Sequence, residues 1–323
     1  MIVVTGGAGF IGSAIAWRLN DLGRNDIIIV DELGLDEKWK NLVALNYSDF
    51  INKNDFIKLV ESNTNLGIDA IIHMGANSST TEKDADHLIS NNYEYTKKLA
   101  KYCIQNNVRF IYASSAATYG DGALGFKDDE TICQSLKPLN MYGYSKNLFD
   151  IWAIKQGIMD KIVGVKYFNV FGPNEYHKGD MRSVVHKAFG QIKSTGKVSL
   201  FKSGHPDYKD GEQKRDFIYV KDAVDMTLFF LDKKDKNGIY NVGSGKARTW
   251  NDLVTAIFNA MNKPVNIEYI DLPAHLAEKY QYFTEAGIDK IKRAGYPHPT
   301  TSLEDGVTDY VKSFLLTGKH LGA

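Results

Sequence analysis

The feature that constrains this chain most is a glycine-rich turn near its start, in the sequence MIVVTGGAGFIG. Gly6, Gly9 and Gly12 follow an apolar run that indicates a buried strand, and they precede AIAWRLNDLG, whose apolar residues recur with helical spacing. Glycines there permit a tight turn and let the backbone approach a ligand, while the amide groups that begin the helix favour a negative charge. The pattern predicts a strand–turn–helix unit that binds the pyrophosphate of a dinucleotide.

Short β-branched runs alternate with segments of helical period along the first half of the chain. Buried strands, each followed by a helix, are expected at residues 2–5, 26–30, 69–73, 109–115 and 162–168. Such alternation is typical of an α/β fold with a parallel sheet. Together with the glycine turn, it predicts a Rossmann-type doubly wound parallel sheet with a smaller C-terminal substrate-binding region.

The rhythm changes after residue 168 and later resumes. KVSLF indicates a short strand without an obvious partner in the sheet, whereas DFIYV and IYNVG, at residues 216–220 and 239–243, resume the α/β pattern. Thr249 and Asp252 have the spacing of a capping box that begins a helix. The expected dinucleotide-binding domain is 1–168 plus about 216–248, and the expected substrate-binding domain is about 169–215 plus 249–323.

Composition limits the class of partner. The 39 basic residues balance 39 acidic ones, so no overall charge attracts nucleic acid or an anionic membrane. Cys103 and Cys133 are too few for a disulfide framework, and His73, His177 and His186 show no metal-ligand spacing. No apolar run approaches the roughly 18 residues of a membrane span, and no charged leader precedes the first strand. We expect a cytoplasmic protein with a small-molecule partner, no metal, no nucleic acid and no membrane.

The adenosine end of the dinucleotide is predicted about 20 residues after the glycine turn, where Asp31 ends the second expected strand. A carboxylate at that place accepts a hydrogen bond from a ribose hydroxyl. Asp31 and Glu32 would repel a 2′-phosphate, whereas Lys38, Lys40 and Lys53 follow in loops that are able to fold over one. The residues alone therefore leave NAD and NADP open.

A tyrosine and a lysine four residues apart indicate the chemistry. Tyr142 and Lys146 lie in a segment of helical period, so their side chains share one face. A neighbouring ammonium group, reinforced by an oxidised nicotinamide, favours the phenolate, which then takes a proton from a sugar hydroxyl. The pair follows an expected strand that ends in Ser114 and Ser115, at the edge where doubly wound sheets bind ligands.

These residues together resemble the extended short-chain dehydrogenase/reductases, through TGGAGFIG, Asp31, Ser115 with Tyr142 and Lys146, and RDFIYVKD. Within that superfamily, GANSSTTEKD, NNYEYTKKL, YASSAATYG, PLNMYGYSK, YFNVFGPNEYHKG and KYQYFT are similar to the ADP-L-glycero-D-manno-heptose 6-epimerases, which act in lipopolysaccharide-core precursor synthesis. The resemblance covers nearly the whole chain. It implies a homo-oligomer that holds NADP, oxidises C6 of an ADP-heptose to a ketone and returns the hydride to the opposite face.

The resemblance also implies roles for individual residues. Tyr142 and Lys178 would transfer protons on the two faces of the carbonyl, because one fixed group cannot easily serve both; Lys146 would assist Tyr142, and Ser115 would hold the reacting oxygen. The implied cofactor-binding residues are Gly6, Gly9, Phe10, Ile11, Gly12, Asp31, Glu32, Lys38, Lys53, Met74, Gly75, Ala76, Asn77, Ser78, Asn91, Lys146, Val170 and Lys178. The implied substrate-binding residues are Ser115, Asn169, Asp180, Lys187, Phe201, Lys202, Ser203, Gly204, Arg215 and Tyr280.

Three departures from the family pattern bear on these roles. Glu32 stands where an asparagine is expected, which adds negative charge near the 2′ position, and Lys187 replaces an expected histidine. The connection before Arg215 is longer than usual. A guanidinium group suits phosphate oxygens, and the structural alternative for Arg215 is an ion pair with Asp216.

Other functions share part of this pattern. A UDP-hexose 4-epimerase keeps the same serine, tyrosine and lysine and is the nearest enzymatic alternative, although the HKG lysine and SSTTE argue against it. Related dehydratases carry Thr-Asp-Glu where this chain has Ser115, Ala116 and Ala117. A dinucleotide-sensing binding protein is the non-enzyme alternative, and such sensors typically lack the Tyr–Lys pair.

Overall fold

The structure is a computed structural model that describes residues 1–62, 65–273 and 280–323. Its main sheet has seven strands in the order β10-β6-β5-β4-β1-β2-β3, all paired in parallel. The strands are β1 (Ile2–Thr5), β2 (Ile27–Asp31), β3 (Asp49–Asn52), β4 (Ala70–His73), β5 (Arg109–Ser115), β6 (Val163–Tyr167) and β10 (Gly238–Val242). The strand order reverses beside β1, and this switch point is where doubly wound sheets open a ligand-binding crevice.

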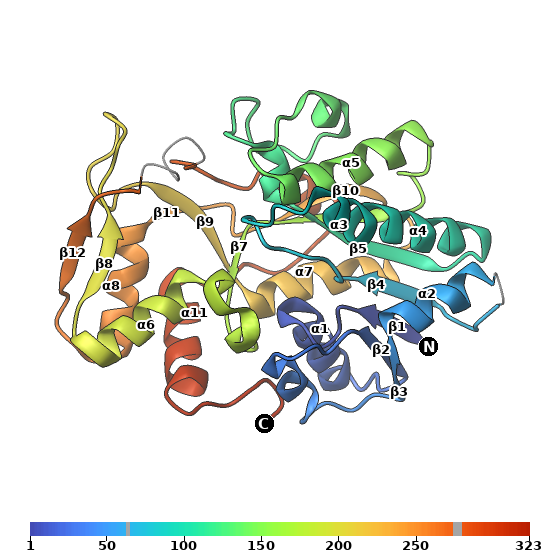
Figure 1. Ribbon diagram of the computed structural model, residues 1–323, viewed down its shortest axis with the longest axis horizontal. Coiled ribbons are helices and arrows are strands. Elements are labelled where there is room, and N and C mark those ends of the chain that lie inside the picture. The colour runs from blue at the N-terminus through green and yellow to red at the C-terminus, as the bar shows by residue number, and fades with distance from the viewer. Residues whose placement is uncertain (63–64, 274–279) are drawn as a thin grey trace.

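Helices cover both faces of the main sheet, which is why its strands β1, β4, β5 and β6 are buried almost throughout. One face packs against α1 (Phe10–Asp21) and α7 (Val220–Asp232), and the other against α2 (Lys53–Glu61), α4 (Tyr95–Gln105) and α5 (Met141–Lys155). Figure 1 shows α1 and α7 on one side of the sheet and α4 and α5 on the other. The expected doubly wound α/β fold is confirmed.

Two small sheets extend from the main one (Figure 1). In the first, β9 (Lys214–Tyr219) lies between β7 (Asn169–Phe171) and β11 (Ala247–Thr249); in the second, β8 (Val198–Phe201) pairs in parallel with β12 (Ile267–Ile270). The helices beside them are α6 (Val184–Thr195), α8 (Trp250–Ala260) and α11 (Leu303–Asp309), whereas α10 (Asp289–Arg293) contacts β10 of the main sheet. The short helical turns are η1 (Glu37–Leu42), α3 (Ala85–Leu88), η2 (Ile89–Glu94), η3 (Ala116–Tyr119), η4 (Glu130–Ser135), η5 (Tyr176–Met181) and η6 (Tyr310–Leu315).

Four strands, β3, β7, β11 and β12, were not expected from the sequence, and a fifth, β9, lies in another sheet than expected. The strand β3 was not expected, because DFIN is short and polar and lies at the exposed edge of the sheet. The strand expected at residues 216–220 forms, as β9, but it belongs to the three-stranded sheet and not to the main sheet. The capping box of Thr249 and Asp252 is confirmed at the start of α8. The division of the chain into two domains stays a prediction.

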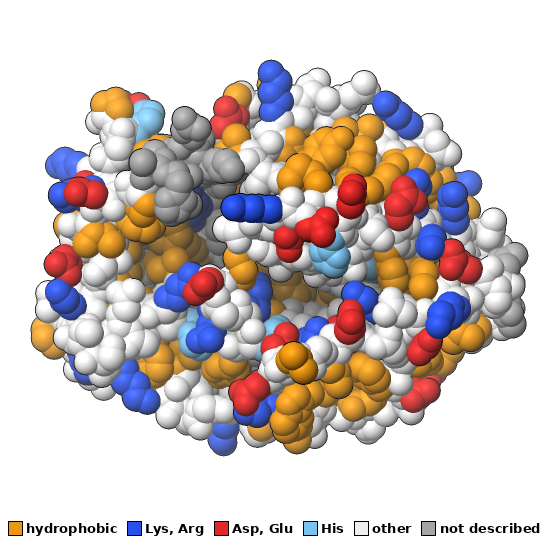
Figure 2. All heavy atoms as spheres, viewed as in Figure 1, with side chains coloured by type: hydrophobic (Ala, Val, Ile, Leu, Met, Phe, Trp, Pro, Cys, Tyr) orange, Lys and Arg blue, Asp and Glu red, His pale blue; other side chains and the backbone are white. Residues whose placement is uncertain are grey.

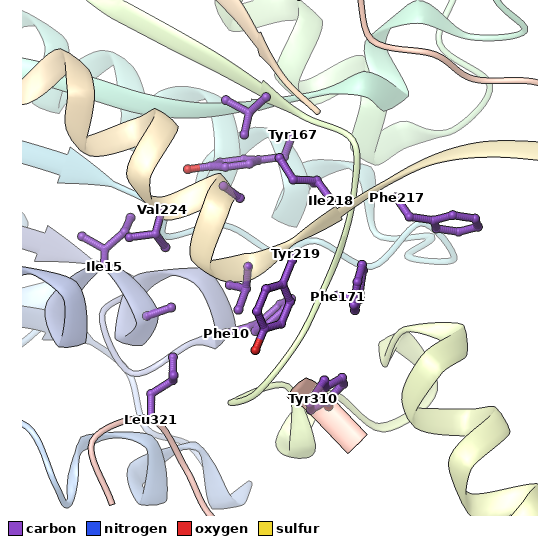
Figure 3. Packing of buried hydrophobic residues seen from close by; sticks show 14 of the residues in the cluster. Phe10, Ile15, Tyr167, Phe171, Phe217, Ile218, Tyr219, Val224, Tyr310 and Leu321 are labelled. Carbon is purple, nitrogen blue, oxygen red and sulfur yellow. The ribbon is translucent and has the colours of Figure 1, made fainter. Parts of the chain in front are cut away.

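One apolar cluster joins the main sheet to the smaller sheets. It includes Phe10 at the start of α1, Phe171 from β7, Tyr219 from β9 and Tyr310 from η6, all buried. Figure 3 shows these rings grouped around the strand that leaves the main sheet. The elements that carry the glycine turn and the HKG loop therefore share one core.

Residues 319–321 return to the N-terminal part of the fold (Figure 1). Asn41, which is 1 % exposed, donates from Nδ2 to the carbonyl oxygens of Ala8 and Asn174, and its Oδ1 accepts a hydrogen bond from His320 at 2.8 Å. Asn174 Oδ1 accepts from the amide of Leu321 at 3.0 Å. The buried side chain of Asn41 thus connects the glycine turn, the segment before Lys178 and residues 320–321. Within the described residues, no helix combines the length and apolarity that crossing a bilayer requires.

Candidate active site

A cleft of about 880 Å³ opens at the carboxyl ends of the main-sheet strands and extends to η5 and the start of α6. Figure 2 shows the molecule hollowed in the middle of this face, with acidic, basic and histidine side chains around the hollow. All the side chains predicted to bind the cofactor, from Gly6 to Lys178, line this cleft. So do Tyr142, Ser115 and Asn169.

The glycine turn has no room for side chains at Gly6 and Gly12. Its backbone is therefore left uncovered toward the cleft. Gly6 has a φ of +64°, and a Cβ on it would lie 2.7 Å from the backbone of Gly75. A Cβ on Gly12 would lie 2.1 Å from the carbonyl oxygen of Gly6. Gly9 is the N-cap of α1 and offers no side chain to its first amide groups. Those amides face the cleft unsatisfied by a cap, which suits the pyrophosphate of a dinucleotide.

The carboxylate of Asp31 fixes the glycine turn. It accepts hydrogen bonds from the amides of Ala8 at 2.9 Å and Glu32 at 2.7 Å, and it forms an ion pair with Lys38 at 3.0 Å. Beside it, Lys53 pairs with Glu32 at 2.6 Å, and this contact lowers the pKa of Glu32. Both lysines at the adenosine end are therefore already paired with a carboxylate.

The helix α5 carries the tyrosine and lysine. Asn140 caps it by accepting from the amide of Gly143 at 2.8 Å, which places Tyr142 in the first turn and Lys146 one turn later. Burial lowers the pKa of Lys146 to about 8, and Asp150 acts in the opposite direction. Burial raises the pKa of Tyr142, and a hydrogen bond with Ser115 opposes that rise.

The expected lowering of the phenol pKa by Lys146 is not found in the protein alone. The ammonium group of Lys146 donates to the carbonyl oxygen of Ala113 at 2.8 Å, and burial dominates the pKa of Tyr142. A phenolate at this place therefore needs a further positive charge in the cleft. An oxidised nicotinamide carries such a charge.

A buried polar network lies behind the pair. Asp150, fully buried, accepts hydrogen bonds from Tyr112 at 2.8 Å and Ser114 at 2.7 Å, and its Oδ2 lies 3.4 Å from Nζ of buried Lys166. Ser114 thus reaches this network, whereas Ser115 hydrogen bonds with Tyr142 and accepts from the amide of residue 117 at 3.1 Å. Sequence reasoning missed Asp150, although its position four residues after Lys146 was a signal.

Lys178 enters the cleft from η5, the turn between β7 and α6. Its Nζ lies 5.4 Å from the centre of the Phe10 ring, next to the glycine turn. Burial lowers the pKa of Lys178, and the nearby carboxylate of Glu175 opposes that change. Two ionisable groups, Tyr142 and Lys178, therefore reach one cleft from separate elements.

Most of the predicted substrate residues lie outside this cleft. The guanidinium of Arg215 packs against the rings of Trp250 and Tyr280, at 5.7 and 5.4 Å, and burial lowers its pKa to about 10. Trp250 itself lines the cleft, so Arg215 and Tyr280 lie behind it. The alternative ion pair with Asp216 is not found among the described residues, and that carboxylate binds backbone amides instead.

Six further predicted substrate residues, Asp180, Lys187, Phe201, Lys202, Ser203 and Gly204, do not line the cleft either. Asp180 is exposed within η5, and Lys187 is exposed on α6. Phe201 ends β8, and residues 202–204 follow it; Lys202 pairs there with Asp271 at 2.9 Å. The structure does not bring these residues to the cleft wall.

One cationic lining residue was missed by sequence reasoning. Arg182 lies between Lys178 and α6 and lines the cleft. Its Nε is buried and makes no hydrogen bond within the part of the chain that the structure describes. The stretch HKGDMRS already placed a second cation four residues after Lys178, which was the available signal.

Comparison with known proteins places the chain in a family. The model of the NAD dependent epimerase/dehydratase family matches residues 2–243. A protein of Nitratidesulfovibrio vulgaris named ADP-L-glycero-D-manno-heptose-6-epimerase is 57 % identical over 98 % of both chains, and one of Fusobacterium nucleatum with the same name is 50 % identical over 98 % of both.

Solved structures agree with this placement. The crystal structure of Helicobacter pylori ADP-L-glycero-D-manno-heptose-6-epimerase has a TM-score of 0.81 at 28 % identity, covering 97 % of this chain and 95 % of that one. A UDP-N-acetylglucosamine 4-epimerase from Methanobrevibacter ruminantium reaches 0.82 at 26 % identity, covering 98 % of both chains. The family match indicates a nicotinamide dinucleotide as the cofactor. This chain belongs to the NAD dependent epimerase/dehydratase family, among relatives named ADP-L-glycero-D-manno-heptose-6-epimerase.

Proposed function

We propose that this chain is an isomerase that converts ADP-D-glycero-D-manno-heptose into ADP-L-glycero-D-manno-heptose by inverting C6. The observation that carries the proposal is the presence of Tyr142, Lys146 and Lys178 in the cleft that holds the glycine turn. The names of relatives that share half or more of its residues support the substrate. Oxidation followed by reduction leaves no net redox change.

The proposed reaction uses two proton-transfer groups, Tyr142 and Lys178. Tyr142, as the phenolate, takes the proton of the C6 hydroxyl while C6 loses a hydride, and Ser115 hydrogen bonds with the oxygen of the resulting ketone. A nicotinamide dinucleotide, held by residues of the glycine turn and by Lys146, would supply the hydride acceptor and donor. Lys178 delivers a proton to the same oxygen when the hydride arrives at the opposite face of C6. Lys146 holds the nicotinamide ribose and assists the phenolate.

We infer that NADP is the form that binds, with NAD as the alternative. Lys38 and Lys53 both lie at the adenosine end, where a 2′-phosphate would replace the carboxylates of Asp31 and Glu32 as their partner. Titration of the protein with each dinucleotide, followed by nicotinamide fluorescence of the reduced forms, measures the two Kd values. A lower Kd for NADPH supports the inference, and a lower Kd for NADH overturns it.

Glu32 offers a direct test of that inference. Glu32→Gln removes a negative charge beside Lys53, so we expect NADPH to bind about 10-fold more tightly, as one charge-assisted contact allows. NADH affinity changes much less. The substitution Glu37→Gln, on an exposed glutamate paired with Lys40, is the control.

Purified protein supplied with ADP-D-glycero-D-manno-heptose and NADP in deuterated water tests the reaction. Proton NMR at C6 is expected to show inversion with the carbon-bound hydrogen retained, because the hydride returns from the dinucleotide and not from solvent. Absorbance is expected to show no net NADPH. Unchanged substrate, a product that has lost water, or conversion of UDP-glucose in its place would overturn the proposal.

Three further expectations stay predictions, two from the resemblance and the cytoplasmic location from the sequence itself. They are assembly as a homo-oligomer, a cytoplasmic location and a place in lipopolysaccharide-core precursor synthesis. Light scattering coupled to size-exclusion chromatography tests the first, because a monomer has the 36.2 kDa mass of the single chain.

A further inference from the structure

We propose that Glu175 is a positioning residue for Lys178: its buried carboxylate closes the loop that carries this lysine and holds the positive charge of the lysine in the cleft. The inference rests on the proposed function, in which Lys178 transfers a proton. Glu175 itself does not line the cleft, so it acts through Lys178 and not on the substrate.

The carboxylate joins the two ends of the loop between β7 and α6. Glu175 is 1 % exposed. Its Oε1 accepts from the hydroxyl of Ser183 at 2.6 Å and from the amide of Gly172 at 3.5 Å, and its Oε2 accepts from the amide of Ser183. Residues 172 and 183 flank η5, so one side chain closes the segment in which Lys178 lies.

The same contacts fix the start of the next helix. Ser183 is the N-cap of α6, where its Oγ accepts from the amide of His186 at 3.4 Å. At the other end, the amide of Lys178 donates to the carbonyl oxygen of Glu175 at 3.0 Å. The backbone and side chain of Glu175 therefore set the place of Lys178 relative to the rigid core.

Every contact of this carboxylate favours its charged form. Burial raises the pKa of Glu175, whereas the amide and hydroxyl of Ser183 and the hydroxyl of Tyr310 lower it. Both amides present N–H groups, which require an acceptor oxygen. Burial dominates, so the pKa of Glu175 is raised, and the hydrogen bonds received on both oxygens oppose that rise.

Glu175 is also the acidic group that acts on Lys178. Burial lowers the pKa of Lys178 and Glu175 raises it. Burial lowers the pKa of His177 to about 4, so its imidazole is neutral near pH 7. Arg182 and Lys38 add positive charge around the cleft, and Asp31 is occupied by Lys38. Removal of the charge on Glu175 therefore makes Lys178 easier to deprotonate.

Glu175→Gln is the decisive variant, because it removes the charge and nearly preserves the volume. We expect the pKa of Lys178 to fall by about one unit, as for the loss of a nearby opposite charge. Competitive acetylation with acetic anhydride over a range of pH, followed by mass spectrometry of the Lys178 peptide, measures that pKa in the dinucleotide-bound protein. The alkaline limb of the kcat profile should move in the same direction, while KM for the ADP-heptose stays within about twofold.

Two further variants separate charge from packing. Ser183→Ala removes a hydrogen-bond donor and the cap but keeps the carboxylate, so the pKa of Lys178 should stay at the wild-type value. Glu175→Asp keeps the charge and should also retain that pKa. An unchanged Lys178 pKa in Glu175→Gln, or an equal fall in Ser183→Ala, overturns the proposal.

Failure of the proposed function has a different signature. Lys178→Met with wild-type epimerisation would show that Lys178 transfers no proton in the reaction. The acetylation experiment does not depend on turnover, so it still reports whether Glu175 sets the pKa of this lysine.

Discussion

At the scale of single residues, burial opposes the charged forms of both proposed reacting groups on α5. It raises the pKa of Tyr142 and lowers that of Lys146 to about 8. Asp150, one turn from Lys146, opposes the effect of burial on that lysine, and among the described residues Ser115 alone opposes it for Tyr142. In the proposed mechanism the phenol would therefore stay neutral until a positive group enters the cleft, so proton removal would depend on occupancy by an oxidised dinucleotide.

Tyr142→Phe tests the role of the phenol. We expect kcat for epimerisation to fall by about 10³-fold, within the usual range for loss of a general base. The Kd for the dinucleotide should change by less than about twofold, because the glycine turn stays intact. Tyr144→Phe is the control on the same helix, since that ring is 46 % exposed. Normal turnover by the Tyr142 variant would contradict the assignment.

His73 predicts a pH dependence of stability. It is buried, its Nε2 lies 2.9 Å from Thr96, and burial lowers its pKa to about 3. The unfolded chain binds a proton near pH 6.5 and the folded chain does not. The stabilisation is therefore complete above pH 6.5 and is lost as the pH falls toward 3, by about 1.4 kcal/mol per pH unit.

Urea unfolding at pH 7.5 and pH 5 measures this effect. Between these two values His73 should account for about 2 kcal/mol of lost stability. His73→Gln should lose less stability than wild type over the same interval. His298→Gln is a control outside the buried core. Equal slopes for wild type and His73→Gln would rule out a buried neutral imidazole.

At the scale of elements, β1, the glycine turn and α1 form the most constrained unit. Gly12→Ala would place its Cβ within 2.1 Å of the Gly6 carbonyl oxygen. We expect the turn to shift, dinucleotide affinity to fall at least about 10-fold and the free energy of unfolding to fall by about 1–3 kcal/mol.

Gly190→Ala is the matched control for this substitution. Gly190 lies exposed on α6 with nothing within 4 Å of a new Cβ. That change should raise stability by about 0.5–1 kcal/mol, from helix propensity, and leave dinucleotide binding unchanged. Calorimetry of both variants with and without NADP decides the matter; a Gly12 variant that binds normally would contradict the described turn.

The elements that could be predicted are those marked by a signal within a few residues of sequence. The β-branched runs of β1 and β4, the glycine turn, and the Thr249 capping box all carry short-range signals. The sequence did not predict which sheet β9 joins, since a buried strand has the same composition in either sheet. The side-chain directions of Ser114 and Arg215 likewise depend on Asp150 and Trp250, which are distant in sequence.

At the scale of the whole molecule, Asn41 connects parts of the chain that are far apart in sequence. Asn41→Ala would remove donors from two buried carbonyl groups and the acceptor of His320. We expect the free energy of unfolding to fall by about 1–3 kcal/mol and dinucleotide affinity to fall as well, because Ala8 belongs to the glycine turn. Asn259→Ala, exposed on α8, is the control; equal effects of the two substitutions in urea unfolding would refute the connection.

The contact between the Asn41 side chain and His320 also predicts an order of events during refolding. His320 lies 279 positions from Asn41, and contacts of such long range form late because a large loop must close first. Helical content should therefore return ahead of the capacity to retain NADPH during renaturation, leaving an interval in which an ordered sheet has no completed pocket.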